Sequence, residues 1–328
     1  MAHLPTPMST PTPPSRTPIH SLRALGVVLV LVCSTVVGAC SNPTPTAGVA
    51  PDGLLALVKG PDGTTLTGWG DRAAGVPIRL PDGDTVWISV GLADVLAATT
   101  LAGKTATSDP VHLGEPLAWR PVKAKVPTGE APTGPDYFAT WDPQGGRFAT
   151  LAGDLLGGDE IRVVLVDPSV GSAYEIPLDR SVVAAPPAWI DGDRLVVVTG
   201  DTAAPAATIV DTTTGELEDG PSGARLVATS ANGRRVATMT GQGAPVVIRD
   251  TSGWLSGDGS SIATIPPPNG SSTAIAFALD STGQRIAVAW AEKDGAVSLA
   301  VHDGRSDWRR VAQPKIGSAK GAVVAWLR

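Results

Sequence analysis

The chain has 328 residues, a length that suits one large or two ordinary domains, and 42% of them are hydrophobic, enough for a core. Its formal net charge is −6, and its 25 Lys and Arg residues form no strong basic patch. Because phosphate binding needs clustered basic residues, this composition argues against nucleic acid as a partner.

The first 39 residues have the organisation of an export signal. Arg16 and Arg23 supply positive charge without acidic neighbours, and an apolar run from Ala24 to Val37 follows. This run is shorter than the roughly 20 residues of a membrane-spanning helix, and a charged part before an apolar part is typical of a secretory signal. We therefore predict that residues 1–39 are a signal peptide.

The end of this signal indicates which type it is. Val37, Gly38 and Ala39 are an aliphatic residue and two small residues directly before Cys40, a pattern that resembles the bacterial lipobox. The resemblance implies that the signal peptidase recognises Val37, Gly38 and Ala39, and that Cys40 carries membrane lipid such as palmitate. Several acyl chains anchor a protein stably, so it also implies a lipid anchor at the extracytoplasmic face of the cell membrane. The alternative is an ordinary signal cleaved after Ala39.

Cysteine usage agrees with this interpretation. The only other Cys, Cys33, lies in the segment to be removed, so the mature chain would have one thiol and no internal disulfide. Residues 40–50 read as the lipidated Cys40 and a flexible polar tether. Because residues 1–39 contain two Arg and no acidic residue, cleavage would change the net charge from −6 to −8.

From residue 51 to residue 328 the sequence predicts an all-β domain. Short β-branched runs such as Arg162–Val166 and Ile286–Trp290 alternate with Gly, Pro and Asp turns, which is typical of strands. Asp62–Gly63 and Asp82–Gly83 predict tight hairpins. The best helix candidate, Leu92–Leu101, has a Thr-Thr end that favours a strand.

A four-strand unit recurs along this domain. Each copy has a first strand, a polar turn, Arg with a β-branched second strand, and a third strand that ends at Asp before a turn and a fourth strand. The copies begin with Tyr137–Thr150, Pro187–Val197, Leu226–Ala237 and Ala276–Ala287, and their third strands end at Asp167, Asp211, Asp250 and Asp303. Four strands repeated every 40 to 50 residues or so are typical of a β-propeller blade.

The two ends of the domain complete each other. Ala322–Arg328 reads as a first strand with no blade after it, and Leu54–Val58 as a second strand with no first strand before it. Pairing them would close the ring and leave no long unpaired edge. With a less regular second blade from Asp84 to about Val122, we predict six blades, with seven as the alternative.

The repeat resembles the TolB-like and WD-repeat-like propellers of exported bacterial proteins. The turn from Trp141 to Arg147, an aromatic residue followed by Asp-Pro-Gln-Gly-Gly-Arg, matches the TolB type best. The resemblance implies an architecture and carries no catalytic residue with it.

Residues that could perform chemistry are scarce. The mature chain has two His, His112 and His302, which we interpret as a surface residue on an irregular stretch and a tolerated strand residue. A zinc site needs three or four ligands and a serine nucleophile needs a shaped turn, and neither pattern occurs. The repeated Asp residues are interpreted as turn formers. We therefore expect no metal, no cofactor and no catalytic residue.

Five of the nine tryptophans form a series at strand ends, and Trp69, Trp119, Trp254 and Trp308 lie outside it. Five are expected to pack between blades: Trp87, Trp141, Trp189, Trp290 and Trp326. Trp254 and Trp308 lie beside the turns that follow the third strands, where an exposed Trp often anchors a partner, so we predict these two as partner-binding residues.

The functional hypothesis is a membrane-anchored, non-catalytic scaffold that binds an unidentified envelope protein or ligand. One alternative is a propeller hydrolase or lactonase whose site is distributed around the central channel. Another is a purely structural envelope protein. Acidic and His side chains converging on the channel would favour the enzyme.

Overall fold

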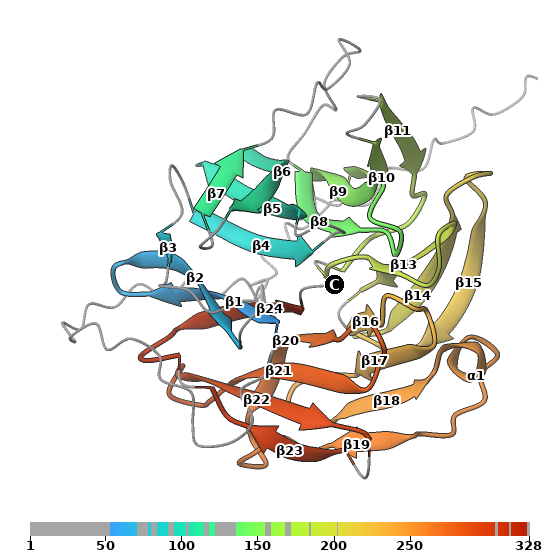
Figure 1. Ribbon diagram of the computed structural model, residues 1–328. Coiled ribbons are helices and arrows are strands. Elements are labelled where there is room, and N and C mark those ends of the chain that lie inside the picture. The colour runs from blue at the N-terminus through green and yellow to red at the C-terminus, as the bar shows by residue number, and fades with distance from the viewer. Residues whose placement is uncertain are drawn as a thin grey trace, which may run out of the picture.

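The computed structural model describes residues 53–70, 78–79, 84–90, 95–102, 105–114, 118–121, 136–154, 159–167, 172–183, 185–201, 203–305, 308–314 and 316–326. Within these ranges the strands form six four-stranded sheets, which Figure 1 shows arranged around a common axis. The predicted all-β propeller with four-stranded blades is therefore confirmed.

We number the sheets as blades in chain order. Blade 1 contains β24 (Gly321–Trp326), β1 (Leu54–Gly60), β2 (Gly63–Trp69) and β3 (Ile78–Arg79), and blade 2 contains β4 (Asp84–Val90), β5 (Val95–Ala102), β6 (Thr105–Gly114) and β7 (Ala118–Pro121). Blade 3 contains β8 (Asp136–Trp141), β9 (Phe148–Asp154), β10 (Asp159–Asp167) and β11 (Ser172–Pro177), and blade 4 contains β12 (Ala188–Trp189), β13 (Arg194–Gly200), β14 (Pro205–Asp211) and β15 (Leu217–Ser222). Blade 5 contains β16 (Leu226–Thr229), β17 (Arg235–Met239), β18 (Val246–Asp250) and β19 (Ala263–Ile265), and blade 6 contains β20 (Thr273–Leu279), β21 (Arg285–Ala291), β22 (Val297–Asp303) and β23 (Arg309–Ala312).

The C-terminal strand joins the N-terminal blade. β24 pairs antiparallel with β1, from Leu54 opposite Trp326 to Lys59 opposite Gly321. The innermost strands contact one another in a ring, β24 to β4, β8, β12, β16, β20 and back to β24. The alternative of seven blades is wrong for the described residues, because β24 completes blade 1 and does not open a further sheet.

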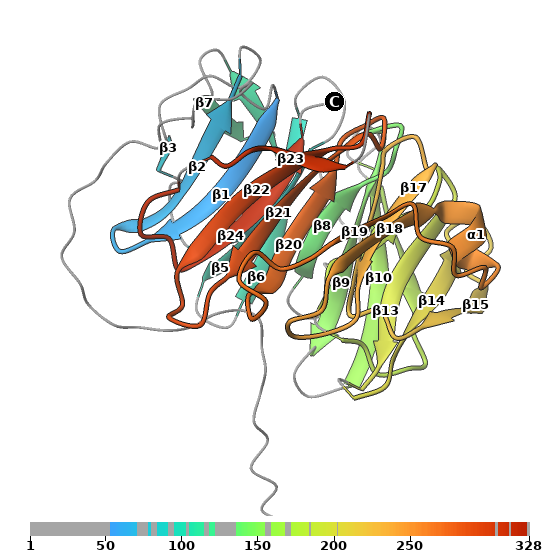
Figure 2. The same cartoon turned by 90° about the horizontal axis from the view of Figure 1, so that it is seen from below.

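The recurring unit follows the predicted order. The third strands of blades 3 to 6 end at Asp, and Asp62–Gly63 forms the hairpin between β1 and β2, with Gly63 at a φ of 113°. Residues 95–101 of the helix candidate lie in strand β5 instead, and residues 92–94 lie outside the described residues. A short helix, α1 (Thr251–Leu255), follows β18 and lies at the periphery of the ring (Figure 2).

The hydrophobic core lies mainly between neighbouring blades. Separate clusters of buried residues join blades 3 and 4, blades 4 and 5, blades 5 and 6, and blade 6 with blade 1. Antiparallel sheets packed in this way bury both faces, which explains why their strands read as nearly continuous apolar runs such as Leu195–Val198 in β13.

The predicted signal and anchor lie outside the described residues. These are residues 1–39, with Val37, Gly38 and Ala39, and the tether that begins at Cys40. The hairpin predicted at Asp82–Gly83 also lies outside them. The structure contains no described helix that is long and apolar enough to cross a membrane.

Candidate functional site

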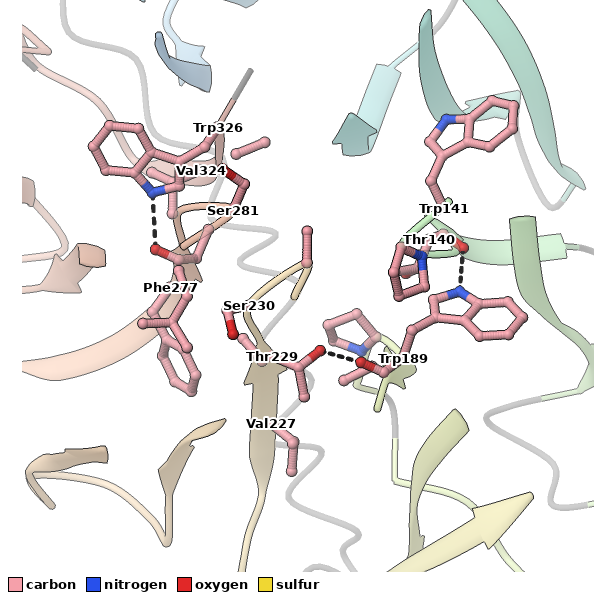
Figure 3. Close-up of a pocket in the computed structure, with 18 of the residues that line it drawn as sticks. Thr140, Trp141, Trp189, Val227, Thr229, Ser230, Phe277, Ser281, Val324 and Trp326 are labelled. Atoms are coloured by element: carbon pink, nitrogen blue, oxygen red, sulfur yellow. Dashed lines mark hydrogen bonds between the residues drawn. The ribbon is translucent and has the colours of Figure 1, made fainter. Parts of the chain in front are cut away.

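A small cavity of about 130 Å³ lies on the propeller axis, where the six innermost strands converge. Its lining comes from all six blades: Ile88; Thr140, Trp141 and Pro143; Pro186 to Trp189; Val227 to Ala231; Phe277 to Leu279 and Ser281; and Val324 to Trp326. Figure 3 shows these side chains around the hollow. Residues far apart in sequence meet here because each blade contributes the end of its first strand.

Three indole rings shape the wall of this cavity. Trp141, Trp189 and Trp326 end the first strands of blades 3, 4 and 1, and they are 3%, 2% and 6% exposed. The Trp189 Nε1–H donates to the carbonyl of Thr140 at 2.8 Å, and the Trp326 Nε1–H donates to that of Ala278 at 3.0 Å (Figure 3). Each of these two bonds links a blade to the preceding one, which confirms the predicted packing role and makes the wall rigid.

Hydroxyl groups supply the polar part of the lining. Thr229 donates to the carbonyl of Trp189, and Ser230 donates to the Oδ1 of Asn232 at 2.7 Å. The other described lining residues are apolar apart from Thr140 and Ser281, and none of the described lining residues is charged. The chemistry of this lining fits an apolar side chain or ligand, since a cavity of similar size lined by apolar residues can hold a benzene-sized molecule.

The sequence did not identify this set of lining residues. The three tryptophans were assigned to packing, and their second role depends on where neighbouring blades place them. Pro186 and Pro187, directly before β12, also line the cavity. A Pro-Pro pair fixes an extended backbone, so it was a visible signal for a rigid connection near the axis.

The structure separates the two tryptophans that were predicted to bind partners. Trp254, in α1, is only 6% exposed and packs into the cluster between blades 4 and 5. The prediction of an exposed Trp254 is therefore wrong, because α1 turns its indole ring inward. Trp308 is half-buried and borders a second hollow, between blades 5 and 6.

The described lining of the axial cavity does not include His302. His112 lies in strand β6 and not on an irregular stretch, opposite Arg120 of β7. His302 lies in β22, with its Nδ1 3.2 Å from the carbonyl oxygen of Trp308. Burial lowers the pKa of His302 below 6.5, and the nearby Arg310 lowers it further. At neutral pH His302 is therefore uncharged.

The strand-ending Asp residues perform the structural role predicted for them in two blades. Asp211 accepts the backbone N–H groups of Thr213 and Thr214, both at 2.8 Å, and Asp303 accepts that of Arg305 at 2.9 Å. The turn after Asp167 lies outside the described residues. In the part of the chain that the structure describes, no group of three or more His, Cys, Asp or Glu residues could hold a metal ion.

The turn that resembled TolB is held between blades 3 and 4. Its Arg147 stacks over the Trp189 ring at 5.4 Å and donates to Thr212 Oγ1 at 3.0 Å, and Asp142 accepts the backbone N–H of Gly146 at 2.9 Å. This motif therefore joins two blades.

Comparisons by sequence assign no family: no protein-family model matches the chain, and no curated protein matches it. Comparisons by structure do find proteins with a similar fold. TolB from Acinetobacter baumannii has a TM-score of 0.58 and 14% identity, over 86% of this chain and 68% of TolB.

Two other solved structures are also similar. A chain in the crystal structure of a nidogen/laminin complex has a TM-score of 0.54 and 10% identity, over 83% of this chain and 97% of that one. The β-propeller domain of Myceliophteria thermophila Cps50 (Swd1) has a TM-score of 0.51 and 15% identity, over 87% of this chain and 92% of that domain. At these identities the likeness concerns the fold alone. The chain therefore has a β-propeller fold similar to that of TolB and of WD-repeat proteins.

Proposed function

We propose that this chain is an exported lipoprotein, anchored through Cys40 to the outer face of the cell membrane, whose propeller binds an envelope protein without catalysing a reaction. The observation that carries the binding role is the axial cavity. This cavity at the centre of the propeller is rigid and mainly apolar, with Thr and Ser hydroxyl groups in its lining. It fits a single apolar side chain from a partner.

The position of strand β1 supports a binding face that lies close to the proposed anchor. Leu54 pairs with Trp326, which lines the cavity, and the backbone N–H of Gly53 donates to Trp69 at 3.1 Å. The chain therefore enters the propeller on the face formed by the turns between the first and second strands, which we call the cavity face. The segment Ser41–Asp52 can extend at most roughly 45 Å, so a partner at the cavity face would lie close to the membrane.

The anchor is tested by labelling. Cells that express the chain are fed a clickable fatty acid, and the Cys40→Ser variant is the control. We expect label on the parent chain and none on the variant, because Cys40 is the proposed acylation site. Equal label on both chains would contradict lipidation at Cys40.

The binding face is tested separately by crosslinking. A photo-crosslinking amino acid is placed at Ser281, which lines the cavity, or at Lys293, an exposed residue in the turn between β21 and β22 on the opposite face. We expect a discrete adduct with one envelope protein from Ser281 and not from Lys293. The same adducts from both positions would contradict recognition at the cavity face.

The non-catalytic part of the proposal is tested with purified full-length chain. We expect no turnover on a panel of ester, lactone, glycoside and phosphate substrates. Reproducible hydrolysis that disappears when one carboxylate facing the channel is replaced would favour the alternative of a propeller hydrolase or lactonase.

A further inference from the structure

A second hollow lies between blades 5 and 6 on the cavity face. Its volume is about 690 Å³, several times that of the axial cavity. Four connections line it: the turns that precede β17 and β21, and the connections after β18 and β22. The lining residues are Gly233, Arg234, Arg235, Asp250, Ser252, Ile262, Thr282, Gly283, Gln284, Gly304, Arg305 and Trp308. We call this hollow the blade 5–6 groove.

The groove is positively charged although the whole chain carries a net charge of −6. Its described lining contains three Arg and one acidic residue, Asp250, which forms an ion pair with Arg235. Arg305 is 62% exposed and lies 3.8 Å from Asp303 at its Nε. Arg234 is exposed, and among the described residues its guanidinium has no ion-pair partner. Arg234 is thus available to an anion, and Arg305 has further N–H donors besides the Nε that faces Asp303.

The floor of the groove is fixed by bonds between the two blades. The side-chain amide of Asn232 donates to the backbone carbonyl of Thr282 at 3.0 Å. The backbone N–H of Asn232 donates to the backbone carbonyl of Ser281 at 3.1 Å. The Arg235 side chain crosses Gly283 so closely that any side chain there would collide with it. A groove with a fixed floor loses little conformational entropy when a ligand binds.

The wall of the groove is apolar at one end. The Trp308 ring lies directly on Gly304, in the space that a side chain at that position would occupy. Trp308 has a φ of 55°, an uncommon left-handed conformation for a bulky residue, and the carbonyl of Trp308 contacts His302. Ile262, 38% exposed, contributes the other apolar lining side chain.

We propose that the blade 5–6 groove binds an acidic peptide segment, with Arg234 and Arg305 holding its carboxylates and Trp308 packing against a neighbouring apolar side chain. The guanidinium group matches a carboxylate through two parallel hydrogen bonds, and Arg and Trp are the residues most enriched in binding hot spots. The volume of the groove exceeds that of a single ion, which favours a peptide over a small anion.

The shape of the groove also favours a peptide over a lipid surface. Its arginines line a hollow and do not project from a flat face. Membrane insertion needs protruding apolar side chains. Within the described part of the chain, Ile262 is the only large hydrophobic residue of this groove that is markedly exposed.

The test measures fluorescence anisotropy with the full chain in a non-ionic detergent. The probe is a short fluorescein-labelled peptide rich in glutamate and leucine, and the control peptide has glutamine in place of each glutamate. We expect the glutamate peptide to bind about tenfold more tightly, because hydrogen bonds to charged groups are the stronger ones. Its affinity should fall as salt is added.

Two double variants separate the groove from general charge effects. Arg234→Gln with Arg305→Gln should weaken binding about tenfold. Lys293→Gln with Lys320→Gln removes the same charge from two exposed positions on the opposite face and should leave binding unchanged. Thermal unfolding of both variants verifies that they are folded.

Three results would overturn the proposal. The first is equal binding of the two peptides, and the second is equal loss in the two double variants. The third is recognition of a different anion: inorganic phosphate displacing the peptide at equal concentration, or phosphatidylglycerol vesicles binding through Arg234 and Arg305 while the glutamate peptide does not bind. Ser281 lies beside Thr282 of the groove, so the crosslink is repeated in the Arg234→Gln with Arg305→Gln variant: an adduct that persists there reports the axial cavity, and failure at one site is then distinguishable from failure at the other.

Discussion

The junction between blades 4 and 5 and the junction between blades 5 and 6 use equivalent connections and are packed differently. After Asp250, α1 directs Trp254 between the blades, where it is 6% exposed. After Asp303, the backbone reaches Trp308 in a left-handed conformation, and its ring lies on Gly304. The first junction is filled by its tryptophan, and the second keeps a groove beside it.

This difference shows that a tryptophan in the same connection of two repeats can be buried between blades or can line a groove. The outcome depends on the few backbone angles that follow the strand-ending Asp. A helical turn carries the side chain back toward the preceding blade, whereas a left-handed residue beside a glycine allows the ring to lie on its own turn. The repeat therefore defines the scaffold, and the connections define the surface.

Opening the ring should have a larger effect than changing either junction. Deletion of residues 321–328 removes β24, exposes the backbone edge of β1 and removes Val324 and Trp326 from the cluster between blades 6 and 1. The loss of unfolding free energy should be larger than that for truncating one buried Trp, which is about 3–5 kcal/mol. Circular dichroism should show a much lower melting temperature or aggregation. An unchanged melting curve would mean that β24 does not contribute to the ring.

Truncating the two tryptophans should reproduce the contrast between the junctions. Trp254→Ala leaves a cavity among buried residues and should cost about 3–5 kcal/mol of unfolding free energy. Trp308→Ala removes a half-buried ring and should cost about 1 kcal/mol. Urea unfolding measures both values. Equal losses would contradict the difference in packing that we describe.

Two glycines provide a finer comparison. Gly233 has a φ of 67° and Gly283 one of 71°, so alanine is strained at either position. The added Cβ would collide with the backbone carbonyl oxygen of Ile190 in the first case and with the Cγ and Cβ of Arg235, close to the backbone, in the second. We expect Gly233→Ala to cost about 3 kcal/mol, because a backbone must move, and Gly283→Ala about 2 kcal/mol.

A third glycine isolates the backbone strain in this series. Gly243 has a φ of 68° and open space around the position of a Cβ. The cost of Gly243→Ala, about 1 kcal/mol, therefore measures the left-handed conformation alone. A cost for Gly233→Ala no greater than this value would show that the backbones of blades 4 and 5 can separate freely.

The smallest effect is expected from protonation beside the groove. Burial lowers the pKa of His302, so below about pH 6.5 the unfolded chain binds a proton there that the folded chain does not. Stability should therefore fall as the pH drops from 7.5 to 5.5. His302→Val, which introduces the residue found at Val210 in blade 4, should reduce this dependence. Melting temperatures across this range provide the measurement, and identical slopes for both chains would contradict the assignment.

Much of the fold could be predicted because its signals are local. The strand ends, the turn formed by Asp211 and the hairpin at Asp62–Gly63 depend on residues within a few positions of one another. The pairing of β24 with β1 was also predictable. Each end of the domain has an incomplete blade, so the unpaired strand at one end can pair only with the unpaired edge at the other. The least regular repeat, Asp84 to about Val122, likewise became a four-stranded blade.

The candidate sites were less accessible to sequence reasoning. Trp254 and Trp308 each follow a strand-ending Asp within a few residues, yet of the two only Trp308 lines the described groove. No sequence pattern marks Arg234 as a binding residue, because a single exposed Arg in a turn is common. Arg234 and Arg305 line the same groove because blades 5 and 6 pack together, and the sequence of neither turn indicates this.

The sequence by itself determined the order of the strands, the repeat and the closing partner, and it predicts the export signal that ends at Cys40. These properties arise from patterns within a repeat, where hydrophobic period and turn chemistry operate over short distances. The tertiary structure decided where the hollows lie and which side chains face them. The axial cavity gathers residues from Ile88 to Trp326, and the blade 5–6 groove gathers residues from Gly233 to Trp308. Such sites depend on how neighbouring blades fit together, because each blade supplies only a fraction of every wall.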